Sequence, residues 1–323
     1  MESLSKYQIL FNDYLETNKQ KPSPHGLYAP IEYILSLGGK RLRPLLALMA
    51  TEAFGNKPEE ALPAALSVEV FHNFTLIHDD IMDQAPIRRG APSVHNKWNE
   101  NTGILSGDAM LIQAYQCLEP YQNDLFVKLI KHTSKTALEV CEGQQYDMDF
   151  ETQKDVSISA YLEMIRLKTA VLVGHSLKIG AWIGYASDQE AQLLYDFGVL
   201  LGMAFQIQDD YLDAFGDPKD FGKQVGGDIL ENKKTILYHE VMKSGNIKEK
   251  KELIQWYDTT VKNNQKVIAV KGIFKSSGAS IASQKLVTSY TEDAFKKLES
   301  LIISAQGKEL LIEFGQNLMN RKF

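Results

Sequence analysis

The sequence predicts an all-α fold in which residues 1–323 form a single helical domain. Long stretches without proline carry apolar residues at helical spacing, and only 10 of the 323 residues are prolines. No run of alternating β-branched residues indicates a sheet. No linker rich in serine, proline and glycine divides the chain, which favours one large helical bundle.

The predicted helices follow from this periodicity. The first apolar pattern begins near Ile9, and a long helix is predicted over residues 58–83, with Phe74 and Ile77 on its apolar stripe. Pro63 falls in its first turns, where a missing amide hydrogen costs least. Further helices are predicted over residues 103–119, 125–150, 158–186, 188–215, 231–243 and 246–261. Residues 268–274 could form a short, isolated strand.

Composition narrows the class of protein. Hydrophobic residues make up 44% of the chain and charged residues 24%, which excludes a disordered chain. The two cysteines are too few for a disulfide framework or a four-ligand zinc site. The net charge of −6 argues against charge-driven binding of nucleic acid. No signal-peptide pattern opens the sequence and no apolar run reaches 18 residues, so we expect a cytoplasmic protein without a stable membrane anchor.

One pattern occurs twice. TLIHDDIMD, which ends at Asp83, and FQIQDDYLD, which ends at Asp213, share an isoleucine, an Asp-Asp pair and a final aspartate in register. Asp79 lies four residues before Asp83, and Asp209 four before Asp213, so each pair shares one helix face. Like charges at this spacing repel, and a divalent cation is the usual compensation. Because Mg²⁺ is typically held by one or two carboxylates together with substrate phosphates, the repeat predicts a metal-bound diphosphate rather than two solvated acidic helix ends.

Basic segments adjoin both aspartate clusters. GGKRLRP supplies Lys40 and Arg43, IRRG supplies Arg88 and Arg89, DPKDFGKQVGGD supplies Lys223, and ENKK supplies Lys233 and Lys234. Any one of these segments by itself is more often a solvated basic face. Their positions beside the aspartates indicate direct cationic donors to a diphosphate.

The order of these motifs resembles the polyprenyl synthetase family, the trans-isoprenyl diphosphate synthases. GGKRLRP, HNFTLIHDDIMDQAPIRRG, GQQYDMDFE, KTA, FQIQDDYLD and DFGKQVGGDILENKKT follow one another between Gly38 and Thr235. The resemblance implies the isoprenoid synthase fold, a helical bundle around a deep central cavity, usually in a homodimer. It also implies head-to-tail condensation of isopentenyl diphosphate with a dimethylallyl, geranyl or farnesyl diphosphate, with three Mg²⁺ ions per diphosphate-bound site.

The resemblance also implies a role for each matching residue. The metal ligands are Asp79, Asp83 and Asp209, supported by Asp80, Asp210, Asp213 and Asp147, with Gln144 next to the metal site. The residues for isopentenyl diphosphate are Lys40, Arg43, His72 and Arg89. The residues for the allylic diphosphate are Arg88, Lys168, Lys223 and Lys233, with Thr169 and Gln206 beside the reacting carbons. The catalytic set comprises Asp79, Asp80, Asp83, Arg88, Lys168, Thr169, Gln206, Asp209 and Lys223.

Product length is predicted from the helix that carries the first motif. Phe71, Phe74 and Thr75 precede Asp79 by one to two turns, where they would line the wall facing the growing chain. The resemblance implies that bulk at these positions stops elongation early, and DDIMD has no two-residue insertion. We therefore expect a C15 or C20 product, with C20 preferred. The two rings could instead be ordinary core packing.

Other interpretations remain open. A class I terpene cyclase also ionises a diphosphate beside DDxxD, but it would need neither GGKRLRP nor IRRG. A non-catalytic subunit of a prenyl synthase commonly lacks one aspartate cluster, and both are present here. His72 could be a core histidine, and Lys168 and Thr169 could be ordinary helix surface.

Overall fold

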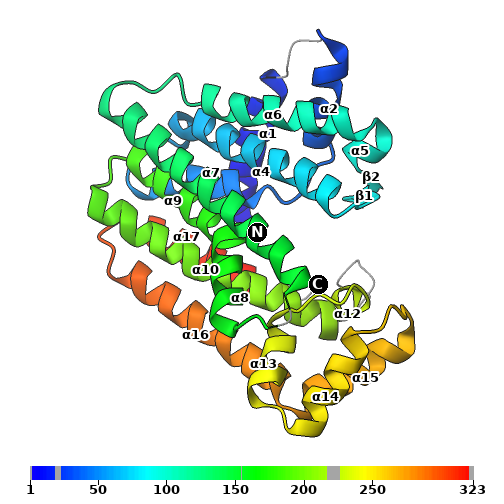
Figure 1. Cartoon of the computed structure of the whole chain (residues 1–323). Coiled ribbons are helices and arrows are strands. Elements are labelled where there is room, and N and C mark those ends of the chain that lie inside the picture. The colour runs from blue at the N-terminus through cyan, green and yellow to red at the C-terminus, as the bar shows by residue number, and fades with distance from the viewer. Residues whose placement is uncertain (1, 19–22, 154, 217–225, 320–323) are drawn as a thin grey trace. The chain divides into compact units, whose positions relative to one another are not determined.

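The computed structural model describes residues 2–18, 23–153, 155–216 and 226–319. These residues are almost entirely helical, and the sheet that they contain is a two-stranded hairpin (Figure 1). The prediction of an all-α fold is confirmed. Lys223, predicted to contact the allylic diphosphate, lies outside the described residues.

The described residues form two compact units, and each is treated by itself. The first comprises Met1–Lys135, His175–Tyr195 and Ile302–Leu311, and the second comprises Thr136–Gly174, Asp196–Leu301 and Ile312–Phe323. Four long helices contribute residues to both units: α7 (Asn123–Thr152), α9 (Val171–Ile183), α10 (Asp188–Phe215) and α17 (Ala305–Met319). The single domain that the sequence predicts stays a prediction.

The first unit is built around α4. Its elements are α1 (Glu2–Thr17), α2 (His25–Ser36), α3 (Leu42–Ala53), η1 (Pro58–Ala61), α4 (Leu62–Met82), β1 (Ile87–Arg88), β2 (Ala91–Pro92), α5 (Val94–Lys97) and α6 (Glu100–Gln116). Pro63 stands in the first turn of α4, as expected from its lack of an amide hydrogen. Helix α4 packs against α3 and α6, and the buried Ser67 hydroxyl donates to the Ala114 carbonyl at 2.6 Å. These contacts fix the helix that ends in the first aspartate motif.

A tight hairpin follows that motif. Ile87 pairs with Pro92 and Arg88 pairs with Ala91 in antiparallel register. The two turn residues both have positive φ, 53° at Arg89 and 78° at Gly90, which is the geometry of a type I′ hairpin turn. The turn therefore holds the backbone of the two neighbouring arginines in a defined conformation. Strands this short carry no alternating pattern, and the sequence did not predict them.

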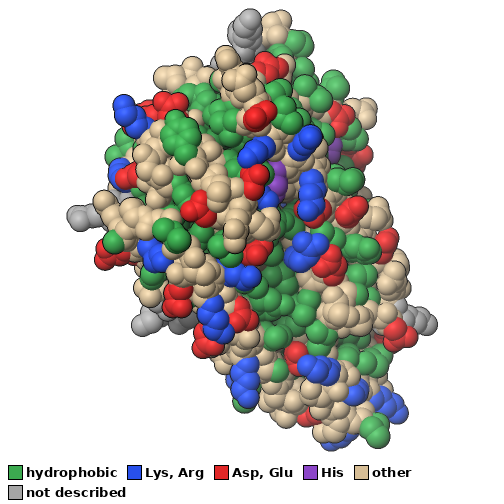
Figure 2. Space-filling view, turned by 90° about the vertical axis from the view of Figure 1, so that its left-hand side faces the viewer, with side chains coloured by type: hydrophobic (Ala, Val, Ile, Leu, Met, Phe, Trp, Pro, Cys, Tyr) green, Lys and Arg blue, Asp and Glu red, His purple; other side chains and the backbone are tan. Residues whose placement is uncertain are grey.

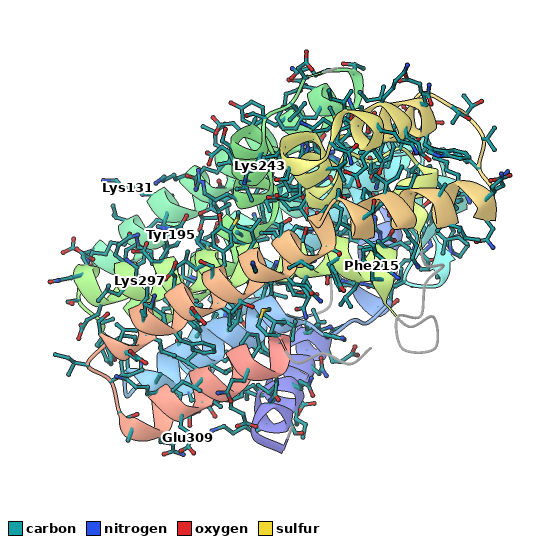
Figure 3. All side chains as sticks on the ribbon, turned by 90° about the horizontal axis from the view of Figure 1, so that it is seen from below. Lys131, Tyr195, Phe215, Lys243, Lys297 and Glu309 are labelled. Carbon is teal, nitrogen blue, oxygen red and sulfur yellow. The ribbon has the colours of Figure 1, made fainter. Side chains whose placement is uncertain are left out.

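The second unit contains the C-terminal helices. Its elements are α8 (Ile158–Ile165), the π-helical turn η2 (Arg166–Ala170), α12 (Gly227–Leu230), α13 (Ile236–Ser244), α14 (Ile247–Tyr257), α15 (Asn264–Ser276) and α16 (Ala279–Glu299), together with parts of the four shared helices. Helix α13 packs against α8, α14, α15 and α16, and its Leu237 and Val241 are fully buried. Phe215, which ends α10, is labelled in Figure 3; Lys271 and Lys275 of α15 lie over its ring.

One predicted element is wrong. The possible strand at residues 268–274 belongs to helix α15. Val270 and Phe274 are buried and lie four residues apart, the spacing of one helix face. The Asn263 side chain accepts the Lys266 amide at the start of the helix, as an N-cap residue does. Apolar runs this short do not distinguish a strand from a buried helix.

Two departures from the predicted helix boundaries concern the candidate site. The helix over 158–186 is interrupted by η2, where the backbone widens to a π-helical turn. The helix over 231–243 begins only at Ile236, because α12 ends at Leu230 and Asn232 adopts a left-handed φ of 60°. Both departures lie beside residues that the sequence assigns to the site.

Candidate active site

The first aspartate motif forms the C-terminal end of α4. Asp80 is fully buried and accepts hydrogen bonds from Nε of Arg88 at 2.9 Å and from its Nη2. Asp79 is half-buried and Asp83 is exposed. The middle aspartate is thus neutralised within the unit by Arg88, a cation that the sequence assigns to the allylic diphosphate. The first and last carboxylates lie nearer the surface, four residues apart on one helix face.

Three of the four residues predicted for isopentenyl diphosphate are brought into contact or close proximity. Arg43 on α3 lies 3.2 Å from Nε2 of His72 on α4. A guanidinium has no acceptor, so the neutral His72 ring accepts this hydrogen bond. The Arg89 guanidinium donates to the Gly38 carbonyl and packs against Gly39, whose φ is +121°. The glycine turn of GGKRLRP and the hairpin turn of IRRG therefore meet.

The electrostatics of this group suit an anion. Burial, followed by the nearby Arg43, Arg89 and Arg88, holds the pKa of His72 well below its usual value. Burial lowers the pKa of Arg43 to about 10, with Glu69 opposing the shift and Arg89 adding to it. Nε of Arg43 is buried without a hydrogen-bond partner among the described residues. Desolvated cations with an unused donor are stabilised by a bound anion. Lys40 lies in the exposed turn just before these residues.

The second aspartate motif repeats the division of roles. Asp210 is buried and accepts hydrogen bonds from the Tyr161 hydroxyl, from Gln206 Nε2 at 3.1 Å and from the Ile236 amide at 3.3 Å. Burial raises the pKa of Asp210 to about 6, although all three donors act to lower it. Asp209 and Asp213 are half-buried. In both motifs, therefore, the middle aspartate faces the interior of its own unit.

A further carboxylate, which the sequence did not single out, accompanies the second motif. The Asp228 amide donates to Asp213 Oδ2 at 3.0 Å. Burial, followed by Asp213 and Asp210, raises the pKa of the Asp228 side chain to about 7. Asp228 is the last residue of the stretch DFGKQVGGD. The sequence did not predict its contact with Asp213, because the two residues are 15 positions apart in the chain.

The π-helical turn η2 presents Lys168 and Thr169. Lys168 Nζ lies 2.5 Å from Asp147 Oδ2 on α7, and the Thr169 hydroxyl donates to Gln206 Oε1 on α10 at 3.3 Å. The first contact joins a residue predicted for the allylic diphosphate to one predicted to support the metal ligands, and the second joins the two residues predicted to lie beside the reacting carbons. π-Helical turns are frequent at functional sites because they re-aim side chains within a helix.

Two glycines allow neighbouring helices to approach η2. A Cβ on Gly143 of α7 would lie 2.7 Å from the Leu167 carbonyl carbon and from Lys168 Cα. A Cβ on Gly202 of α10 would lie 2.8 Å from Ala170 Cα. Ordinary contacts begin at 3.4 Å. Only glycine fits at either position, so the backbone that carries Lys168 and Thr169 is held from two sides.

Comparison with known proteins decides the family. A family model described as polyprenyl synthetase matches residues 24–274. The chain belongs to this family. It is 38% identical over 302 residues to a geranylgeranyl diphosphate synthase of Methanosarcina mazei, covering 93% of this chain and 91% of that one. It is 36% identical over 255 residues to a geranylfarnesyl diphosphate synthase of Natronomonas pharaonis, covering 73% and 74%.

The fold comparison agrees with this assignment. A crystal structure of a geranylgeranyl pyrophosphate synthase superposes with a TM-score of 0.95, at 51% identity and with 99% of each chain covered. The predictions of the family and of a prenyltransferase are confirmed. None of the helices that the structure describes has the length and apolar composition needed to cross a bilayer.

The donor set of this polyprenyl synthetase fits Mg²⁺ together with a diphosphate. The partly exposed aspartates of each motif offer carboxylate oxygens, the hard donors that Mg²⁺ prefers. Among the described residues, no group of three or more His, Cys, Asp or Glu side chains forms a closed metal cage. An open carboxylate pair is the arrangement in which Mg²⁺ is completed by waters and substrate phosphates.

The residues predicted to limit product length lie on α4. The rings of Phe71 and Phe74 are buried and meet edge to face, with centroids 5.5 Å apart. Phe74 also meets the His78 ring edge to face at 4.9 Å. The Thr75 hydroxyl donates to the His72 carbonyl at 2.8 Å, so the polar atom of this residue is occupied by its own helix. Whether the rings set product length stays a prediction.

The remaining predicted cation, Lys233, adjoins the second motif: its amide donates to the Asp228 carbonyl at 2.9 Å, and its charge opposes the raised pKa of the Asp228 carboxyl. Lys233 is exposed and pairs with Glu231 at 3.4 Å, a surface pair of small energetic value. Its neighbour Lys234 instead donates to the carbonyls of Phe150, at 3.4 Å, and of Gln153 at the end of α7. Lys234 therefore connects ENKK to the end of α7, and Asn232 connects it to α15 by accepting a hydrogen bond from Lys266 Nζ. On the face shown in Figure 2, acidic and basic side chains are interspersed, so the net charge of −6 forms no single acidic surface there.

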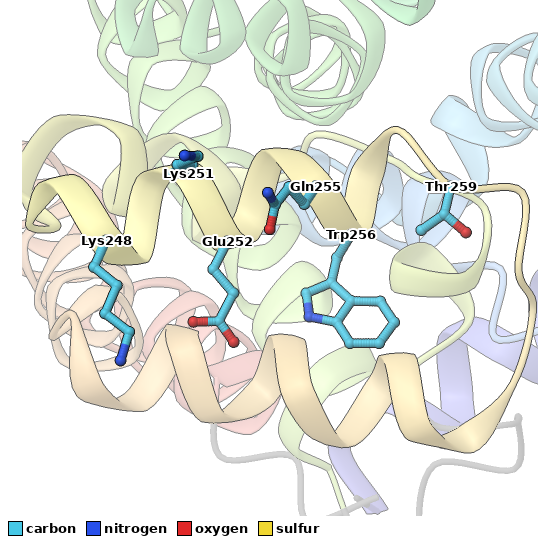
Figure 4. A pocket seen from close by; sticks show the side chains of 6 residues that line it. All are labelled: Lys248, Lys251, Glu252, Gln255, Trp256 and Thr259. Carbon is cyan, nitrogen blue, oxygen red and sulfur yellow. The ribbon is translucent and has the colours of Figure 1, made fainter.

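One hollow in the second unit lies away from every predicted residue. It has a volume of about 760 Å³ and lies along α14 (Figure 4). Its lining residues are Lys248, Lys251, Glu252, Gln255, Trp256 and Thr259. It is open and lined by little more than one helix, so it is no part of the candidate site.

Proposed function

We propose that this polyprenyl synthetase condenses isopentenyl diphosphate with an allylic diphosphate, head to tail, to give a short-chain all-trans polyprenyl diphosphate and pyrophosphate. One observation carries the proposal beyond family membership. Both DDxxD motifs place the middle aspartate in the hydrogen bonds of its own unit and leave the first and last near the surface. A carboxylate pair repeated in this way suits a substrate that arrives with divalent cations.

The proposed reaction breaks the C–O bond between the allylic C1 and its diphosphate. Mg²⁺ held by Asp79, Asp83 and Asp209 would neutralise the charge that develops on the departing pyrophosphate. Lys168 would add direct cationic stabilisation. The isopentenyl double bond then donates its electron pair to the allylic cation, forming a C–C bond. A proton leaves the adjacent isopentenyl carbon, and the departed pyrophosphate is the proposed acceptor. No nucleophilic side chain is required.

The chain's own residues bind and orient the second substrate in this proposal. Arg43, His72 and Arg89 would hold the diphosphate of isopentenyl diphosphate, with Lys40 at the entrance. The support is the contact of Arg43 with the neutral His72 ring and the buried, unpaired Nε of Arg43. Holding both substrates in reacting order converts an encounter in solution into a step within one complex.

The proposed product has 20 carbons. The geranylgeranyl diphosphate synthases among the relatives make this length the central expectation. The geranylfarnesyl diphosphate synthase of Natronomonas pharaonis shows that similar chains carry names of longer products. The buried Phe71–Phe74 pair, one to two turns before Asp79, supports an early stop. Dimethylallyl, geranyl and farnesyl diphosphate are all proposed primers.

A homodimer in the cytoplasm is also proposed. Leu105 and Ile112 of α6 are each 60% exposed and lie seven residues apart on one helix face. Ile104 beside them is 45% exposed. An apolar stripe of this kind on a helix is covered at low cost by a second copy of the same surface. Sedimentation of the wild type against Leu105→Glu would test this; a monomer in both would contradict it.

Product analysis tests the proposed reaction. The purified protein is incubated with Mg²⁺, labelled isopentenyl diphosphate and each allylic primer in turn, and the products are chromatographed. Incorporation of label into a C15 or C20 diphosphate supports the proposal. Cyclised hydrocarbon from the allylic diphosphate without incorporation would instead indicate a terpene cyclase. No turnover with any primer would indicate a non-catalytic subunit.

Metal dependence and two variants test the aspartates. Chelation by EDTA should stop turnover, and added Mg²⁺ should restore it. Asp79→Ala and Asp209→Ala should each lower kcat by at least about 100-fold, because each removes a proposed metal ligand. Asp293→Ala is the matched control, since Asp293 is exposed and its ion pair among the described residues is a surface pair with Lys296 at 2.8 Å. Near-normal rates in both motif variants would contradict the metal assignment.

A further inference from the structure

Tyr161 of α8 forms a hydrogen bond with the second aspartate motif that no motif of the sequence predicts. Its side chain is only 4% exposed, and its hydroxyl donates to Oδ2 of Asp210, the middle aspartate of the second motif. Burial, followed by the charge of Asp210 and their hydrogen bond, raises the pKa of Tyr161 far above its usual value. The hydroxyl is therefore held by a buried acceptor inside the unit.

The hydrogen bonds around Asp210 tie α10 to three other segments. Tyr161 reaches Asp210 from α8, and the Ile236 amide reaches it from the start of α13 at 3.3 Å. Gln206 donates to the other carboxylate oxygen at 3.1 Å and accepts from Thr169 of η2 at 3.3 Å. Asp210 is thus one point at which hydrogen bonds fix α10 to its surroundings.

The position of Asp210 within the motif means that its hydrogen bonds also affect the direction in which Asp209 and Asp213 face. Asp209 and Asp213 lie on one face of α10, and Asp210 lies about 100° further round the helix than Asp209. A rotation of the helix about its axis would move both outer carboxylates together. Tethering Asp210 to a rigid donor in the core resists this rotation.

We propose that Tyr161 is a positioning residue for the prenyl transfer, acting through Asp210 to fix the direction in which Asp209 and Asp213 face. The inference rests on the proposed function, in which Asp209 holds Mg²⁺. Arg88 has the corresponding place in the first motif, where it binds the buried Asp80. The two motifs are therefore held by different donors: a guanidinium in one and a phenol in the other.

The test compares two tyrosine-to-phenylalanine variants of the full chain. Tyr161→Phe removes the donor and keeps the ring. Tyr238→Phe is the matched control, because Tyr238 is buried in the same core cluster and its ring also meets His239. For each protein, kcat, the KM for isopentenyl diphosphate, the Mg²⁺ concentration at half-maximal rate and the melting temperature are measured.

Tyr161→Phe is expected to lower kcat about tenfold or more and to raise the half-maximal Mg²⁺ concentration several-fold, as for loss of a hydrogen bond to a charged group. The KM for isopentenyl diphosphate should stay within about twofold, because the cations proposed for that substrate are on other elements. Tyr238→Phe should match the wild type in its Mg²⁺ requirement. A normal kcat and Mg²⁺ requirement in Tyr161→Phe would overturn the proposal, as would a lower kcat with an unchanged Mg²⁺ requirement and a lower melting temperature.

A double-mutant cycle tests whether Tyr161 acts through Asp210. Asp210→Asn is made alone and together with Tyr161→Phe. Adding Tyr161→Phe to the Asp210→Asn protein should lower kcat by less than about twofold, because the effects of two residues in one hydrogen-bond network are not additive. Independent, multiplicative losses would overturn the proposal. A wild type that forms no product with any primer would instead overturn the proposed function, so the two failures are distinguishable.

Discussion

The closest helix approach in the candidate site makes Gly143→Ala an informative substitution. The added methyl group would lie 2.7 Å from Leu167 C and Lys168 Cα and closer still to the Lys168 amide nitrogen. Ordinary contacts begin at 3.4 Å, so the backbone of η2 must move by about 0.7 Å or more. These neighbours are backbone atoms, which cannot turn aside as a flexible side chain could.

The magnitude follows from this overlap. Overpacking of a dense interior costs about 1–3 kcal/mol, so the melting temperature should fall by several degrees. The larger effect is expected on turnover, since η2 carries Lys168 and Thr169. A displacement of about 1 Å in a group that positions a substrate lowers the rate by about 100-fold. The assay is steady-state condensation of labelled isopentenyl diphosphate, with melting followed by circular dichroism.

Gly272→Ala is the matched control for this substitution. Gly272 is exposed in the middle of α15, and a Cβ there would meet nothing within 4 Å. Replacing it should raise stability by about 0.5–1 kcal/mol, because alanine loses less conformational entropy in a helix. Opposite signs of the stability change in the two variants are therefore expected. A Gly143→Ala protein with wild-type melting temperature and kcat would refute the reasoning.

Three further predictions follow from the described contacts. Phe74→Ala and Phe71→Ala should each shift the products toward longer chains, because removing a ring opens the space before Asp79. The products are chromatographed after reaction at low temperature, since each substitution also destabilises the core. Unchanged product lengths in both variants would contradict the proposal that these rings limit chain length. Arg88→Ala should lower the free energy of unfolding by about 3–5 kcal/mol, because Asp80 is left buried and unpaired, and adding Asp80→Asn should restore part of this; urea denaturation measures both, and no loss in Arg88→Ala would count against the pair. Burial lowers the pKa of His175 to about 3 and that of His239 to about 4, so below pH 6.5 the unfolded chain binds protons that the folded chain excludes. His72 and His132 also have lowered pKa values, so four histidines oppose the two carboxyls with raised values, Asp210 and Asp228. Stability should therefore still fall from pH 7 to pH 5, by up to about 1.4 kcal/mol per pH unit for each histidine in excess, and a urea midpoint that is constant over this range would contradict it.

Much of the fold was predictable because a helix is indicated by the spacing of apolar residues within its own stretch of sequence. The helix over 188–215 has the same bounds as α10, since its apolar residues recur at helical spacing over its whole length. The strand predicted at 268–274 failed because a short apolar run fits either structure until its neighbours are known. The π-helical turn η2 was also hidden, because its wider backbone depends on helices that approach at Gly143 and Gly202.

The candidate site likewise contains features that the sequence predicts and contacts that only the tertiary structure shows. The spacing of Asp79 and Asp83, and of Asp209 and Asp213, places each pair on one helix face whatever the rest of the chain does. The pairing of Arg88 with Asp80 instead depends on a hairpin turn that the sequence did not predict. Arg88 was expected at the diphosphate, and the structure shows that it also neutralises a buried carboxylate.

The sequence by itself determined the all-α class, the family and the two metal-type motifs, because each rests on residues close together in the chain or on motif order. The tertiary structure alone decided what the middle aspartates do. Asp210 meets a tyrosine 49 residues earlier and an amide 26 residues later. No local pattern encodes such contacts, because they form only when separate helices pack and bury a carboxylate that must then find donors.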